Sequence, residues 1–120
     1  MKVSAKASLY IAGLTILLSG CGPWSYLASY EHDIRSATRD IETAHDDVHR
    51  STAYTKRGSA YSEKARYSRA FKLIPMDEYA RVFGQAIQDH DRAIALNSAS
   101  AEAYFAREWL ITTGPCWRWW

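Results

Sequence analysis

The sequence predicts an all-α fold. Downstream of residue 30, apolar residues recur at spacings of three and four, which is the pattern of amphipathic helices. No stretch alternates apolar and polar residues for long enough to indicate a β-sheet. The chain has 120 residues, which leaves room for one domain at most. We therefore expect one small helical domain.

Residues 1–20 have the pattern of a secretory signal peptide. Two lysines near the start precede an apolar stretch over 7–18, and two small residues, Ser19 and Gly20, lead to Cys21. The apolar stretch is too short to span a membrane comfortably as a helix. We therefore expect the segment to direct export of the chain and to be removed.

The end of this segment resembles the bacterial lipobox, in which a leucine and two small residues precede a cysteine. The resemblance implies cleavage between Gly20 and Cys21 and attachment of a diacylglycerol to the Cys21 thiol. Two or three acyl chains make a stable membrane anchor. The lipobox resemblance therefore implies a lipoprotein of the cell envelope, on the periplasmic or outer-membrane side. The alternatives are an ordinary signal peptide with a coincidental cysteine, or a signal anchor.

Residues 21–30 are expected to form a lipidated tether before the helical domain. Gly22 and Pro23 disfavour regular structure directly after the lipid. Trp24, Tyr26 and Tyr30 are amphipathic aromatic residues of the kind that settle at a bilayer surface. The alternative is that these side chains pack against the first helix.

Charge and cysteine content narrow the possible partners. Removal of residues 1–20 takes away two lysines, so 15 Lys and Arg fall to 13, equal to the 13 Asp and Glu. A mature chain without net formal charge does not favour nucleic-acid binding. If Cys21 carries a lipid, Cys116 has no partner within the chain, and no disulfide framework forms.

Two helices are expected before Pro75. The first covers about residues 31–44, where Ile34, Ala37, Ile41 and Ala44 recur at spacings of three and four. The second covers about 51–74, and its apolar side includes Tyr54 and Phe71. Pro75 ends it, since proline disfavours the helical conformation in the residue before it.

Two further helical patterns follow Pro75. The first runs over about residues 76–96, with Asp77 and Glu78 in its first turn, where the helix dipole favours negative charge. Asn97 and Ser98 end it. The last helical pattern begins near Ala101.

The order of residues within these helices resembles the tetratricopeptide repeat. Residues 53–61 resemble the first helix of a repeat, residues 86–96 its second helix, and residues 101–107 the start of another first helix. The resemblance implies a short α-solenoid of antiparallel hairpins over residues 31–107, with partial units on both sides. The residues expected to pack between its helices are Tyr54, Gly58, Tyr61, Ala86, Ala93 and Tyr104.

The chain departs from this family in repeat length. Tyr54 and Tyr104 lie 50 residues apart, which is 16 more than the 34 of a standard repeat. Helical patterns continue on both sides of Pro75, so we expect both helices to be longer by about two turns. His90 stands where an aromatic residue is usual, and we expect it to be a core residue.

Residues 108–120 are expected to be an irregular, tryptophan-rich tail. Four of the five tryptophans of the chain lie in its last 12 residues. A frameshift or truncation of a longer repeat lipoprotein, without independent function, is one explanation. The other is a tail that docks on a membrane or a partner.

Residues with catalytic chemistry are sparse, and we expect no enzymatic activity, no cofactor and no metal. His45 and His49 are four apart, but Asp46 stands where a metalloprotease has glutamate. A solvated linker is the competing interpretation of this segment. A metal-binding or hydrolytic factor that uses His32, His45 and His49 remains the alternative function.

Basic residues dominate the second helix and suggest a binding surface. Lys56, Arg57, Lys64 and Arg69 lie on this helix against one acid, Glu63. In the resembled family the first helices line a groove for peptides, so a basic groove would bind an acidic protein or peptide partner. The alternative is a solvated helix face. The expected function is protein–protein interaction at the bacterial envelope.

Overall fold

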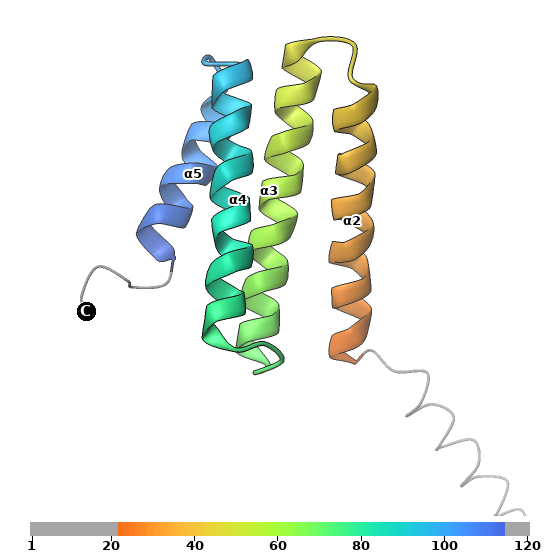
Figure 1. Cartoon of the computed structure of the whole chain (residues 1–120), viewed down its shortest axis with the longest axis vertical. Coiled ribbons are helices and arrows are strands. Elements are labelled where there is room, and N and C mark those ends of the chain that lie inside the picture. Colours follow the sequence, from red (N-terminus) through yellow and green to blue (C-terminus); the bar gives the residue numbers. More distant parts are fainter. Residues whose placement is uncertain (1–21, 115–120) are drawn as a thin grey trace, which may run out of the picture.

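The computed structural model describes residues 22–114, which fold into four helices (Figure 1). They are α2 (Pro23–Thr43), α3 (Asp47–Ala70), α4 (Met76–Leu96) and α5 (Ala101–Thr113). No β-strand occurs among these residues, so the predicted all-α class is confirmed. None of the four helices has both the length and the apolar composition needed to cross a membrane.

The helix α3 is the centre of the arrangement. It contacts α2, α4 and α5, whereas α2 contacts α3 alone (Figure 1). The side chains that α3 buries are all small: Ser51, Ala53, Thr55, Gly58, Ala60, Ser62, Ala65 and Ser68. Because these side chains are small, neighbouring helices can pack closely against more than one face of α3. The buried residues are therefore spread around the helix and do not form one apolar stripe.

The antiparallel helices α3 and α4 meet through small residues. Ala86 and Ala93 of α4 are completely buried. A Cβ atom placed on Gly58 would lie 3.0 Å from the Ala86 carbonyl oxygen. The Ser51 hydroxyl donates a 2.7 Å hydrogen bond to the carbonyl of Ala93. The α3 and α4 backbones therefore approach each other at Gly58 and Ala86, two of the residues expected to pack between helices.

The apolar core lies between α3, α4 and the end of α5. Its buried members are Ala65, Tyr79, Val82, Phe83, Ala86 and Leu110. Helical structure lies on both sides of Pro75, as predicted, but the expected bounds of the second helix, about residues 51–74, were wrong, because α3 runs from Asp47 to Ala70. The helix ends before Pro75, where Phe71 caps it and Lys72 takes a φ of 55°. The two helices contain 24 and 21 residues.

The expectation that residues 23–30 lack regular structure was wrong, because α2 begins at Pro23. Proline suits the first position of a helix, where its fixed backbone angle is already helical and its missing N–H is not needed. The rings of Tyr26 and Tyr30 also pack on Tyr67 of α3, with centroid distances of 5.4 and 6.1 Å. Tertiary contacts therefore continue to the start of the helix.

The expectation that residues 108–120 are irregular was wrong for residues 108–113, which complete α5. Leu110 is buried against the core, and the Gly114 N–H donates a 2.8 Å hydrogen bond to its carbonyl. Packing of this one side chain stabilises the last turns of α5. The rest of the tail, with Cys116, and the segment up to Cys21 lie outside the described residues.

Candidate functional site

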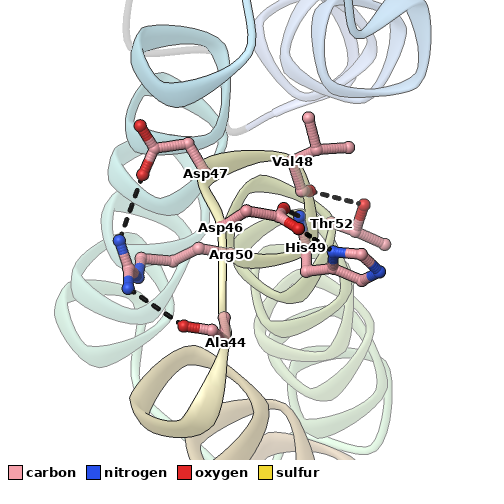
Figure 2. Close-up of polar contacts among 7 residues, drawn as sticks. All are labelled: Ala44, Asp46, Asp47, Val48, His49, Arg50 and Thr52. Atoms are coloured by element: carbon pink, nitrogen blue, oxygen red, sulfur yellow. Dashed lines mark hydrogen bonds and ion pairs between the residues drawn. The ribbon is translucent and has the colours of Figure 1, made fainter.

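The histidine-rich segment between α2 and α3 forms a helix cap (Figure 2). A carboxylate oxygen of Asp46 accepts a 2.8 Å hydrogen bond from the backbone N–H of His49, and the other lies 2.7 Å from His49 Nδ1. The backbone bond is the main cause that lowers the pKa of Asp46, followed by the bond to the ring. Asp46 therefore satisfies a backbone donor that the helix leaves unpaired.

The neighbouring polar side chains complete this junction (Figure 2). Arg50 donates to the Asp47 carboxylate at 3.1 Å and to the Ala44 carbonyl at 3.2 Å. Among residues 22–114, no three His, Cys, Asp or Glu side chains gather closely enough to hold a metal ion. His32 and His45 are both exposed. The contacts around His49 belong to the start of α3.

His90 is a core residue, as predicted, with 1% of its surface exposed. Burial lowers its pKa, against the opposing influence of Asp89 and Asp91. The two flanking carboxylates pair with different helices, Asp89 with Arg57 of α3 and Asp91 with Arg107 of α5. Both carboxylates are therefore engaged in ion pairs with arginines of other helices rather than with the His90 ring.

Two of the four candidate partner-binding residues are used inside the molecule. Arg57 Nε and Nη2 donate to the Asp89 carboxylate at 2.7 and 2.9 Å, and this bond raises the pKa of Arg57. Lys64 forms an ion pair with Glu31 of α2. Lys56 and Arg69 are exposed. The four basic residues therefore do not form one continuous basic surface. Two of them form ion pairs with other helices of the same chain, and the other two are separate exposed charges.

One groove on the described part of the chain is acidic. It has a volume of about 410 Å³ and lies between α2 and α3, with Glu102 of α5 among its lining residues. Buried alanines, Ala37 and Ala60, belong to its lining. Its charged members are Asp33, Asp40, Lys56, Glu63 and Glu102. Four acids and one base give the groove a net negative charge.

Sequence reasoning missed this groove, although part of its signal was present. Asp33 and Asp40 are seven residues apart, which places both on the same face of α2. Ala37 lies between them at helical spacing and is buried. The spacing shows a shared face, but it does not show which neighbouring helix forms the opposite wall.

The six expected packing residues divide into three groups. Gly58, Ala86 and Ala93 are buried between α3 and α4. The two tyrosines of α3, Tyr54 and Tyr61, are half-buried. Tyr61 borders the apolar core, whereas the Tyr54 ring lies beside the guanidinium groups of Arg57 and Arg92.

The sixth expected packing residue, Tyr104 of α5, is exposed together with its neighbour Phe105. Ala103, one position earlier, is completely buried instead. The first turns of α5 therefore pack through alanine rather than through the tyrosine that the repeat pattern indicates.

Comparison of the chain with known proteins identifies no relative. No family model, curated protein or solved structure matches the chain.

Proposed function

We propose that this chain is a lipid-anchored, tetratricopeptide-like lipoprotein that binds a partner protein at the bacterial cell envelope. The observation that carries the proposal is the open acidic groove between α2 and α3. The close α3–α4 contact at Gly58 and Ala86 supports the likeness to a repeat hairpin, since small residues stand at the positions where such hairpins touch. The lipobox-like residues before Cys21 support the anchor.

The groove favours a basic partner segment over the acidic one that the sequence suggested. Asp33, Asp40 and Glu63 are exposed at its walls and form no ion pair with another described residue. Opposite charges on a partner would steer association and fix its register. Because the carboxylates are exposed, this attraction weakens as salt concentration rises.

Charge reversal in the groove tests the binding proposal. We expect Asp33→Lys/Asp40→Lys to weaken binding of a fluorescent lysine-rich peptide about tenfold, because like charges then face the ligand. The measurement is fluorescence anisotropy with the full chain in detergent micelles. A glutamate-rich peptide of equal length serves as the second probe.

The matched control variant is Glu42→Lys/Glu108→Lys, which makes the same charge change at exposed positions outside the groove. It is expected to retain most of the affinity. Equal losses in the two variants, or preferential binding of the glutamate-rich peptide, would show that the groove does not select a basic segment.

Intact mass spectrometry of the native protein from the membrane fraction tests the anchor. The expected mass is that of residues 21–120 plus two or three acyl chains. A Cys21→Ser variant should keep residue Met1, because the lipidation that precedes cleavage cannot occur. A native mass that includes Met1 and lacks acyl chains would refute the proposed lipoprotein.

A further inference from the structure

Exposed apolar side chains gather at one end of the helix bundle. Trp24 and Phe71 are 71% and 52% exposed, and Tyr26, Leu73 and Met76 are also exposed. These five residues are called the apolar end below. They belong to the first turns of α2, to the α3–α4 turn and to the start of α4.

The two parts of the apolar end lie side by side. Figure 1 places the start of α2 and the α3–α4 turn at the same end of the bundle, opposite the α2–α3 connection. The Tyr67 ring connects them, because its centroid lies 5.4 Å from that of Tyr26 and 4.6 Å from that of Phe71. The other exposed large apolar side chains among the described residues are Val48, beside the α2–α3 connection, and Tyr104, Phe105, Trp109 and Ile111 of α5.

The exposed α3–α4 turn is held by backbone hydrogen bonds. The Leu73 N–H donates a 2.8 Å hydrogen bond to the Ser68 carbonyl, and the Lys72 N–H donates a 3.0 Å bond to the Arg69 carbonyl. Lys72 has a φ of 55°, in the left-handed region where a helix commonly ends with glycine. This helix-ending motif holds Phe71 and Leu73 in solvent on either side of Lys72.

The chain that precedes the described residues joins the molecule at this same end. It comprises residues 1–21 and ends with Cys21, directly before Gly22 and the start of α2 at Pro23. Three residues of extended chain span about 10 Å. A lipid on Cys21 would therefore hold Trp24 within about that distance of the bilayer surface, without a flexible tether between them.

Building on the membrane attachment proposed above, we propose that the apolar end rests in the bilayer interface and fixes the orientation of the bundle on the membrane. Tryptophan and tyrosine favour this interface, where the ring is shielded and its polar group stays hydrated. Phe71, Leu73 and Met76 supply the apolar contact. The groove between α2 and α3 then runs away from the surface, along the bundle.

The charges near this end indicate how the contact depends on lipid type. Arg69 and Lys72 are exposed beside the turn, and Asp77 and Glu78 are exposed in the first turn of α4. Two bases and two acids cancel, so the contact is apolar rather than electrostatic. It should form on phosphatidylcholine vesicles and gain little from added anionic lipid.

Depth-dependent fluorescence quenching tests the proposed orientation. The full chain with Cys116→Ser is placed in phosphatidylcholine vesicles, and an environment-sensitive dye is attached at Leu73→Cys or at Ser98→Cys. Ser98 is exposed in the α4–α5 connection and gives the matched control. A nitroxide-labelled lipid should quench the dye at position 73 several-fold more than the dye at 98, while aqueous iodide should do the reverse.

The outcomes separate this inference from the anchor. If the chain floats with the vesicles but the two dyes are quenched equally, the anchor stands and the orientation is refuted. If the chain does not float with the vesicles, both are refuted. Self-quenching between dyes at position 73 without quenching by lipid would assign the apolar end to a second copy of the chain and also refute the inference.

A second pair of variants tests the contribution of the turn itself. With the dye moved to Met76→Cys, Phe71→Ser/Leu73→Ser should reduce quenching by the nitroxide lipid several-fold. Tyr104→Ser/Phe105→Ser removes two exposed apolar side chains from α5 and should leave it unchanged. Circular dichroism confirms that each variant is folded. Unchanged quenching in the turn variant would refute the role of Phe71 and Leu73.

Discussion

Replacing Gly58 with leucine is expected to destabilise the domain by about 3 kcal/mol or more, near the upper limit for overpacked cores. A Cβ atom at this position would lie 3.0 Å from the Ala86 carbonyl oxygen and 3.0 Å from two ring atoms of His90. The oxygen belongs to the backbone of α4 and cannot rotate away, so a larger side chain must separate α3 from α4. Urea unfolding followed by circular dichroism measures the loss.

Gly84 provides the matched control for this prediction. It lies in α4, and a Cβ atom built there meets nothing within 4 Å. Gly84→Ala should therefore stabilise the protein by about 0.5 to 1 kcal/mol, because alanine is the better helix former. Gly58→Ala gains the same helix propensity but should be destabilising on balance. If the urea midpoint of Gly58→Leu equals that of the wild-type protein, the close approach of α3 and α4 is not needed for stability.

Replacing Arg57 with methionine is expected to lower the free energy of unfolding by about 3 to 5 kcal/mol. The Arg57 and Asp89 side chains are 16% and 4% exposed, so the change leaves a buried carboxylate without its two hydrogen bonds. Arg92 Nη1 lies 3.7 Å from the same carboxylate and offers partial compensation. The measurement is the urea midpoint at neutral pH.

A double-mutant cycle separates two contributions to the lost stability: the loss of the Arg57–Asp89 ion pair and the cost of burying the Asp89 carboxylate without a partner. Arg57→Met/Asp89→Leu should recover most of the lost stability, since apolar side chains of similar size can replace a buried ion pair. Lys64→Met gives the control, because the side chains of Lys64 and Glu31 are 30% and 42% exposed and such pairs contribute at most about 1 kcal/mol. A double variant no more stable than Arg57→Met would contradict the explanation.

The helices were predictable because their signals are local. Apolar spacing identified all four helical regions, but α3 ends at Ala70 rather than directly before Pro75. The boundaries were less well predicted where packing extends a helix. The start of α2 was missed because Pro23 acts as a first helical residue rather than as a helix breaker. The packing of Tyr26 and Tyr30 on Tyr67, which is far away in sequence, also supports this start.

The sequence by itself determined the all-α class, the presence of helices on both sides of Pro75 and the burial of His90. These features follow from residue spacing and side-chain size along single helices. The pairing of charges was decided only by the tertiary structure. Arg57 and Asp89 are 32 residues apart, and Lys64 and Glu31 are 33 apart.

Helical periodicity specifies which side chains share a face, but it does not specify which neighbouring helix that face meets. For this reason a helix that looks basic in the sequence becomes, after folding, one wall of an acidic groove. Its partner α2 supplies Asp33 and Asp40 to the opposite wall, while Asp89 of α4 and Glu31 of α2 neutralise two of its cations.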